Sequence, residues 1–152
     1  MTVDLLIRQA KVTDAHACSN ILQEWIAETD WFAGKDAQSA STEAVAEEIQ
    51  NNIFTVAHRA DDLVGFSCME GDILNFLYIA SHCQNQGVGV VLLNRCKFAN
   101  PLGFSLWTFQ KNTAARRFYE REGFTEAERS NGDRNEEGLP DIRYFWQKEV
   151  SK

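Results

Sequence analysis

The stretch Gln84-Asn85-Gln86-Gly87-Val88-Gly89 lies between an almost wholly apolar run, Ile73–Ile79, and a helical pattern over Val90–Phe98. An uninterrupted apolar run of this length is typical of a strand covered on both faces. The first N–H groups of a helix lack internal partners, and together with the helix dipole they attract anions. Because glycine has no side chain, Gly87 and Gly89 would let a phosphate approach the backbone. The stretch predicts a strand–loop–helix unit that binds a phosphate or pyrophosphate. Close packing of the helix on the strand is the alternative explanation of the two glycines.

Spacing excludes two common nucleotide-binding loops. A dinucleotide fingerprint requires a third glycine shortly after Gly89, where Val90, Val91 and Leu92 follow instead. A Walker loop requires a lysine, and residues 84–89 contain none.

Around this loop, apolar spacing predicts strands and helices along the whole chain. Apolar residues at intervals of three and four predict helices after Thr13 and after Thr42, and another over Asn112–Glu122. β-rich runs predict strands at Leu5–Ala10, Ile53–Ala57, Leu63–Cys68, Ile73–Ile79, Phe104–Phe109, Phe124–Arg129 and Ile142–Gln147. The predicted order is β-α-α-β-β-β-α-β-α-β-β. It indicates an α/β fold in which about four helices flank a mixed central sheet of about 6–7 strands.

Composition and charge narrow the classes of function. The chain has 152 residues, 44% of them hydrophobic and 24% charged, so we expect a single globular domain over residues 1–152. The net charge of −7 disfavours nucleic acid and anionic membranes as partners. Residues 24–72 carry eleven acidic and two basic side chains, whereas residues 73–121 carry six basic and one acidic. The phosphate loop therefore lies in the basic part of the chain.

The four cysteines and the N-terminal stretch indicate the compartment. Cys18, Cys68, Cys83 and Cys96 show no paired spacing, so we expect neither a metal site nor a disulfide framework. No run is apolar and long enough for a signal peptide or a membrane span. We therefore expect a cytoplasmic protein with reduced thiols.

A second motif begins twenty-five residues after Gly87 and reads Asn112-Thr-Ala-Ala-Arg-Arg-Phe-Tyr119, followed by Gly123-Phe124. Together with Gln84-x-x-Gly87-x-Gly89, it closely resembles the motifs of the GNAT-type N-acetyltransferase family. The order of elements also matches, and the segments 106–110 and 135–144 are similar to those of a bacterial subgroup. The resemblance implies the GNAT fold with acetyl-CoA (coenzyme A) as the cofactor, and leaves the acceptor open.

In this resemblance the loop and the end of the preceding strand hold the cofactor. Backbone N–H groups of the loop would bind the pyrophosphate, the strand would pair with the pantetheine arm, and an N–H near Leu77 would polarise the thioester carbonyl. The residues implied to bind the cofactor are Leu77, Tyr78, Ile79, Gln84, Asn85, Gln86, Gly87, Val88, Gly89, Val90, Asn112, Ala115 and Tyr119.

Tyr119 is the candidate catalytic acid. Attack of an amine on the thioester expels a thiolate, and a positioned phenol can give it a proton. The alternative is that Tyr119 is only a core aromatic, since it shares a helix face with Ala115 and Phe118.

The catalytic base is left open. Many relatives carry a carboxylate where this chain has Ile73, which cannot exchange protons. The nearest carboxylates are Glu70 and Asp72, and Asn75 could orient a water molecule. A chain of water molecules without a single base is an equal alternative.

The candidate acceptor site combines acidic and aromatic side chains after the first predicted helix. These are Trp25, Glu28, Asp30, Trp31 and Phe32, and such a lining suits a cationic amine. Alternatively, Trp25 belongs to the core and Trp31 anchors a loop.

Two later residues are further acceptor candidates. Trp107 could face the same pocket as the aromatic group or the core. Arg143 could bind a carboxylate, which would indicate an amino-acid-like acceptor.

These observations predict an N-acetyltransferase that acetylates a primary amine of a small molecule in a ternary complex, without a metal. Acetylation of a protein or peptide amine is an alternative. A non-catalytic acyl-CoA-binding sensor is another, favoured by Ile73 in place of a carboxylate. The resemblance does not decide whether the protein forms a homodimer.

Overall fold

The computed structural model describes residues 4–32, 40–135 and 137–149. Within these residues the chain forms seven strands and four α-helices, in the order predicted from the sequence, with three short 3-10 turns added. The α/β prediction is therefore confirmed. Among the described helices, none combines the length and the apolar character needed to cross a membrane.

The strands and helices have the following bounds. The strands are β1 (Leu5–Gln9), β2 (Ile53–Arg59), β3 (Asp62–Glu70), β4 (Ile73–Ile79), β5 (Phe104–Phe109), β6 (Thr125–Ser130) and β7 (Asp141–Trp146). The α-helices are α1 (Ala15–Glu28), α2 (Thr42–Asn51), α3 (Val88–Ala99) and α4 (Thr113–Arg121). The 3-10 turns are η1 (Val12–Asp14), η2 (Asp30–Phe32) and η3 (Ser81–Cys83).

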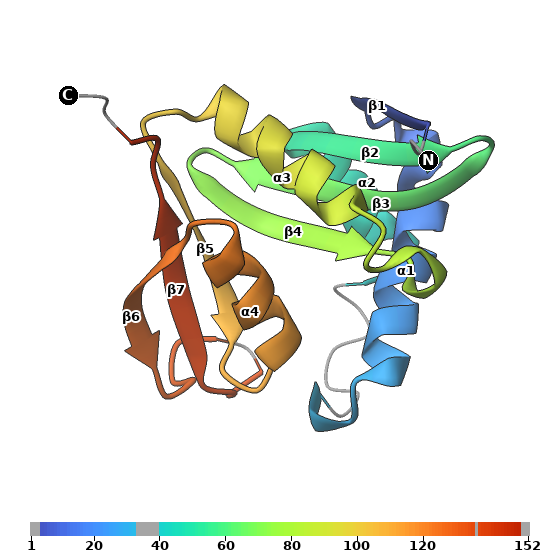
Figure 1. Ribbon diagram of the computed structural model, residues 1–152. Helices are drawn as coiled ribbons and strands as arrows, with labels where there is room; N and C mark the ends of the chain where they lie inside the picture. Colours follow the sequence, from blue (N-terminus) through green and yellow to red (C-terminus); the bar gives the residue numbers. More distant parts are fainter. Residues whose placement is uncertain (1–3, 33–39, 136, 150–152) are drawn as a thin grey trace.

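One mixed sheet runs through the molecule in the order β1-β2-β3-β4-β5-β7-β6. All neighbouring strands are antiparallel except β4 and β5, which are parallel. These two strands pair only at their first residues, Ile73 with Ser105 and Leu74 with Leu106. Beyond that junction they diverge, β4 toward α1 and β5 along α4 (Figure 1).

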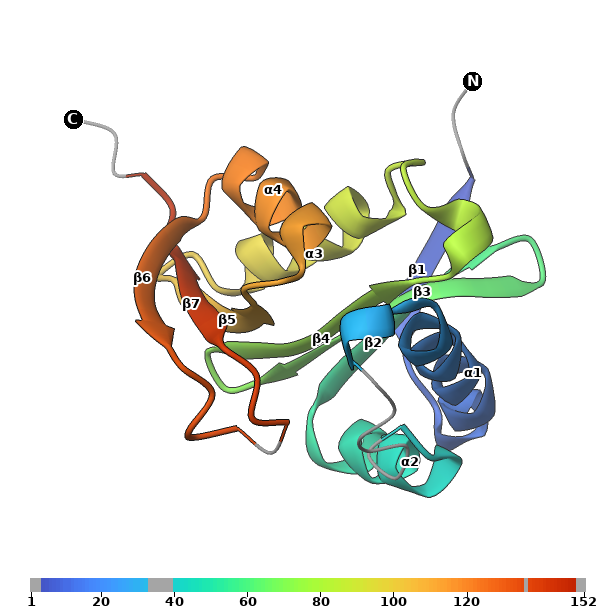
Figure 2. The same cartoon turned by 90° about the horizontal axis from the view of Figure 1, so that it is seen from below.

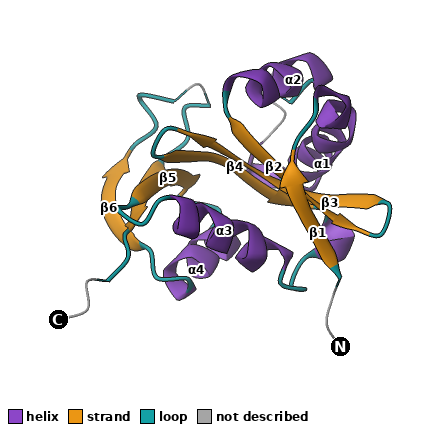
Figure 3. Cartoon of the chain, turned by 90° about the horizontal axis from the view of Figure 1, so that it is seen from above, coloured by secondary structure: helices purple, strands orange, loops and turns teal. Residues whose placement is uncertain are grey.

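Helices cover both faces of the sheet. Helices α1 and α2 lie on one side and α3 and α4 on the other, as the two views along the sheet show (Figures 2 and 3). Under α1 and α2 the core is built on Phe54 and Phe66, whose rings stack 5.3 Å apart. Under α4 it is built on Leu106 and Tyr144, which are 2% and 0% exposed. The second core also includes Leu74 of β4, so it continues across the β4–β5 junction.

Candidate active site

A cleft of about 410 Å³ opens where β4 and β5 separate. Its walls come from the end of α1, the second half of β4, the loop into α3, and one face of α4. The lining residues are Trp25, Glu28, Thr29, Leu77, Tyr78, Ile79, Cys83, Gln84, Asn85, Gly87, Gly89, Val90, Asn112, Ala114, Ala115, Phe118, Tyr119 and Arg121.

Gly87 shapes the loop at one end of the cleft. It is the N-cap of α3 and adopts a left-handed conformation with φ +87°, which disfavours any residue with a Cβ. Helix α3 therefore begins at Val88, two residues earlier than the apolar pattern predicts. No side chain caps this helix, so the N–H groups of its first turn remain available to an anion in the cleft.

Gly89 lies in the first turn of α3, against α4 and β4. A Cβ on Gly89 would lie 3.4 Å from Cζ of Phe118 and 3.8 Å from Cγ1 of Ile79, whereas a Cβ on Gly87 would meet no atom within 4 Å. Helix α3 thus packs closely against α4 and β4 at Gly89. Backbone conformation thus favours glycine at position 87, whereas a Cβ at position 89 would make only ordinary van der Waals contacts, so packing does not require glycine there.

Tyr119 reaches the cleft from the buried face of α4. Asn112 caps this helix, and its Oδ1 accepts a hydrogen bond from the N–H of Ala115 at 3.2 Å. The Tyr119 side chain is only 8% exposed and packs against Phe118 and Phe124. Burial raises the pKa of its phenol, so the group stays protonated and can donate a hydrogen bond. Tyr119 is therefore both a core aromatic and a cleft residue.

Eleven of the thirteen residues expected to bind the cofactor line this cleft. The exceptions are Gln86, whose side-chain amide donates to the carbonyl of His82, and Val88, which is 1% exposed beneath the loop. Binding of the cofactor by these residues remains a prediction.

Three residues of α4 belong to the wall but were not predicted from the sequence. Ala114, Phe118 and Arg121 line the cleft, and their spacing of four and three places them on one helix face. This spacing could have identified them. Arg121 brings a positive charge to the mouth of the cleft, where its guanidinium lies 5.5 Å from the centre of the Phe118 ring.

The candidate bases lie at the other end of β4. Glu70 and Asp72 flank the β3–β4 turn, and the Asn75 amide donates to Oε1 of Glu70 at 2.7 Å. The carbonyl of Asp72 accepts the N–H of Ser105, which closes the β4–β5 junction. Among the described residues that line the cleft, none belongs to this group. A role of these residues as base stays a prediction.

The predicted acceptor aromatics form one cluster. The ring of Trp25 lies 5.1 Å from that of Phe32 and 5.6 Å from that of Tyr78. Phe32 and Trp31 each lie 5.6 Å from Phe109. The cluster therefore joins the end of α1 to the end of β5, across the opening between the two diverging strands.

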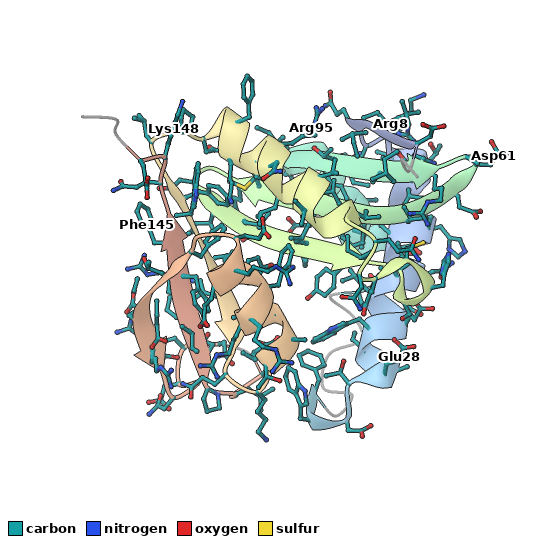
Figure 4. The ribbon with its side chains drawn as sticks, viewed as in Figure 1. Arg8, Glu28, Asp61, Arg95, Phe145 and Lys148 are labelled. Carbon is teal, nitrogen blue, oxygen red and sulfur yellow. The ribbon has the colours of Figure 1, made fainter. Side chains whose placement is uncertain are left out.

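Two glutamates near the C-terminal end of α1 accept hydrogen bonds from Ser81, the first residue of η3. Oε1 of Glu24 accepts the backbone N–H of Ser81 at 3.0 Å, which lowers the pKa of Glu24. Oε1 of Glu28 accepts the hydroxyl of Ser81, and Figure 4 shows Glu28 near the lower end of the helix. Glu28 lines the cleft, whereas Asp30 is not among the described lining residues. Glu28 thus combines a place in the cleft wall with a structural hydrogen bond.

A second cavity of about 370 Å³ lies at the end of β5, beside the loop between β6 and β7. Its lining residues are Trp107, Thr108, Phe109, Ser130, Arg134, Asn135, Glu137 and Asp141. Trp107 lines this cavity rather than the cleft that Trp25 lines or the core, the two places considered from the sequence, and it is 41% exposed. Sequence reasoning did not identify the charged residues Arg134 and Glu137. They belong to the connection between two strands, and no periodic pattern marks which of its side chains turn inward.

The segment 135–144, which contains Arg143, is held by hydrogen bonds to β6 and within its own loop. Arg143 lies opposite Trp107 in the β5–β7 register, but its Nε donates to Oε1 of Glu128 at 2.7 Å. Arg143 is not among the described residues that line either cavity, and carboxylate binding by it remains a prediction. The buried Asp141 accepts hydrogen bonds from Ser130 and Asn135 and so fixes the loop.

Part of the sequence matches a known family and a known protein. The model of the acetyltransferase (GNAT) domain matches residues 50–126, about half of the chain. A probable N-acetyltransferase of Mycobacterium tuberculosis is 40% identical over 52 residues, which are 34% of this chain and 30% of that protein. The match thus spans less than a third of that relative's length.

Solved structures share the whole fold. YjaB of Escherichia coli, in its apo form, superposes with a TM-score of 0.79 at 21% identity, over 96% of this chain and 99% of that one. YncA of Salmonella typhimurium, solved with its cofactor acetyl-CoA, superposes with a TM-score of 0.75 at 17% identity, over 98% of this chain and 96% of that one. At these identities the likeness concerns the fold alone.

Proposed function

The chain belongs to the GNAT acetyltransferase family, and from that premise we propose that it transfers the acetyl group of acetyl-CoA to a primary amine of a small molecule. One observation carries the proposal. The cleft between the diverging strands has the start of α3, with no side-chain cap, at one end and a buried, protonated phenol in its wall. A thioester with a phosphate-bearing arm matches that combination.

The two walls divide the binding of acetyl-CoA between them. The first turn of α3 and the left-handed Gly87 would hold the pyrophosphate through backbone N–H groups. From Asn75 onward, β4 has no partner strand on its β5 side within the described residues. An extended pantetheine arm could pair with this edge as an added strand does. Arg121 at the mouth would add positive charge for phosphate.

The chemistry then follows from two groups at the cleft. A backbone N–H near Leu77 would stabilise the negative charge that develops on the thioester oxygen during attack. The Tyr119 phenol, which burial keeps protonated, would give its proton to the departing thiolate, and the proton that the attacking amine loses would restore the phenol. Both groups act on a ternary complex, because neither forms a covalent bond with the acetyl group.

A second candidate function is a non-catalytic acyl-CoA sensor. It is favoured by the position of Glu70 and Asp72 at the junction end of β4, outside the described lining of the cleft. The buried Tyr119 in the cleft wall favours catalysis instead.

A binding and turnover experiment separates these functions. The full chain is titrated with acetyl-CoA by calorimetry and then assayed for release of the CoA thiol with small primary amines and with a lysine-containing peptide. We expect binding, and thiol release that depends on a small amine. Binding without release on any amine would indicate the sensor, and release only with the peptide would indicate a protein acceptor. Failure to bind acetyl-CoA would contradict the proposal altogether.

A further inference from the structure

The loop that would hold the pyrophosphate has no charged side chain of its own. From Ile73 to Asn94 the sequence contains no lysine, arginine, aspartate or glutamate. A phosphate bound to this stretch would therefore meet only backbone N–H groups and neutral side chains. Because a diphosphate is an anion that loses water when it binds, a positive charge near the loop would strengthen binding. That charge has to come from another part of the chain.

Arg59, the last residue of β2, lies behind the start of this loop. Its Nη1 donates a hydrogen bond to Sγ of Cys83 at 3.5 Å. Cys83 is the last residue of η3, is 2% exposed and lines the cleft directly before Gln84. Cys83 thus contacts the guanidinium of Arg59 and also belongs to the wall of the cleft.

The guanidinium of Arg59 is incompletely paired within the described part of the chain. Its Nη2 is buried and has no hydrogen-bond partner there, and the guanidinium forms no ion pair with a described residue. Asp62 lies opposite Arg59 in the β2–β3 register, but Asp62 is exposed and does not pair with it. A buried charged N–H without a partner costs free energy, so the fold itself does not explain why a cation stands here.

Resting on the proposed binding of acetyl-CoA, we propose that Arg59 is a positioning residue for the diphosphate of the cofactor. Its guanidinium provides positive charge from behind the loop, across Cys83, while backbone N–H groups at Gly87 make the direct hydrogen bonds. A partly buried charge is screened much less by salt than an exposed one. Arg121 at the mouth of the cleft differs, because its side chain is 67% exposed and pairs with Glu122.

Arg95 provides a matched control. It carries the same charge on α3 (Figure 4), is exposed and is not among the described residues that line the cleft. It follows Val88 by two helical turns, about 10 Å along the axis, where solvent and salt screen its charge. Arg59→Gln and Arg95→Gln therefore change the net charge equally and differ in where the charge is lost. Arg59→Lys keeps the charge and changes the shape of the group that carries it.

The first experiment combines calorimetric titration of the full chain with acetyl-CoA and denaturant unfolding. We expect Arg59→Gln to bind acetyl-CoA about tenfold more weakly than wild type, Arg59→Lys within about threefold and Arg95→Gln within about twofold. The denaturant midpoint of Arg59→Gln should not fall, because the substitution removes a buried charge that has no ion pair. A merely structural role would lower stability and affinity together, and lysine would not restore them.

The second experiment tests the phosphate site without the rest of the cofactor. Inorganic pyrophosphate is added to the full chain up to about 10 mM, and the backbone N–H signals of Gly87 and Gly89 are followed by NMR. We expect both signals to shift in wild type. Pyrophosphate should bind about tenfold more weakly to Arg59→Gln and with unchanged affinity to Arg95→Gln.

Three results would overturn the inference. The first is equal acetyl-CoA affinity in wild type and Arg59→Gln. The second is an equal loss of affinity in Arg59→Gln and Arg59→Lys together with a lower denaturant midpoint, which would show a structural role. The third is a pyrophosphate titration that leaves the signals of Gly87 and Gly89 unmoved or gives the same affinity in wild type and Arg59→Gln. Failure of the proposed function is recognised separately, because wild type would then bind pyrophosphate at the loop and not acetyl-CoA.

Discussion

The two halves of the sheet differ in how they are built and in what they bring to the cleft. In the first half, β1 to β4 are joined by antiparallel pairing along nearly their whole lengths, and in the second half β5, β7 and β6 are joined in the same way. Between the halves, β4 and β5 share only two residue pairs. The cleft exists because the two halves of this one sheet are joined only at the start of β4 and β5.

The halves also differ in the kind of contact they offer. The first half contributes the edge of β4 that has no partner strand on its β5 side and the loop at Gly87, together with side chains such as Trp25 of α1. The second half contributes side chains, with Tyr119 from α4 and Trp107 and Phe109 from β5. We expect from this difference that the first half mainly binds the cofactor and that Tyr119 of the second half acts in the proposed chemistry. Four substitutions test this division.

The largest effect is expected at the junction. Leu106 is 2% exposed and pairs with Leu74, so Leu106→Ala should leave a cavity under α4 and lower the free energy of unfolding by about 3 kcal/mol. Leu102→Ala is the control, because Leu102 is 93% exposed and its truncation should change stability by less than about 0.5 kcal/mol. Denaturant unfolding measures both. Equal losses would mean that the junction does not hold the halves together.

The next effect concerns catalysis in the second half. Tyr119→Phe removes the proton donor of the cleft and should lower turnover about 100-fold, with nearly unchanged affinity for acetyl-CoA. Tyr144→Phe is the matched control, since Tyr144 is fully buried in the same core and its hydroxyl donates to Oε2 of Glu120. Thiol release measures turnover. If both variants lose turnover equally, Tyr119 is only a core aromatic.

A smaller effect concerns the backbone of the first half. Gly87→Ala and Gly71→Ala place an alanine at φ +87° and +60°, where no atom lies within 4 Å of the added Cβ. Both should therefore lose about 1 kcal/mol of stability through strain alone. Only Gly87 lines the cleft, so only Gly87→Ala should also weaken acetyl-CoA binding, by about tenfold. Calorimetric titration compares them. Equal affinity in the two variants would show that the loop does not bind the phosphates.

The sequence predicted the elements well because periodicity and turn residues are local signals. The order of strands and helices is confirmed, and eleven of the thirteen expected cofactor residues line one cleft. The divergence of β4 from β5 could not be predicted, because pairing over two residues rather than six leaves no local pattern. Phe109 and Glu137 were missed for the same reason, since their place beside the opening depends on how the halves meet. Arg143 pairs with Glu128 across a register shift between Glu126 and Glu128, which the alternation of residues does not reveal.

The smallest expected effect tests whether an ion pair between Arg8 and Asp14 adds to the stability of the first half of the sheet. Both guanidinium nitrogens of Arg8 on β1 donate to the carboxylate of Asp14 at 2.8 Å, and the N–H of Lys11 donates to it at 2.7 Å. These bonds, that to Arg8 foremost, hold the pKa of Asp14 below its ordinary value. Because the folded pKa is the lower one, the stabilisation is present above the ordinary carboxyl pKa. It is lost as the pH falls through the folded value.

Asp14→Asn should therefore lower the free energy of unfolding by about 1 kcal/mol at neutral pH, and the difference from wild type should vanish in strong acid. Asp61→Asn, in the exposed β2–β3 turn, is the control and should change stability by less than about 0.5 kcal/mol at any pH. Hydrogen exchange should show the loss first at β1 and β2 and not at β5 and β7. An equal loss in both halves would mean that the β4–β5 junction, short as it is, makes the two halves unfold as one.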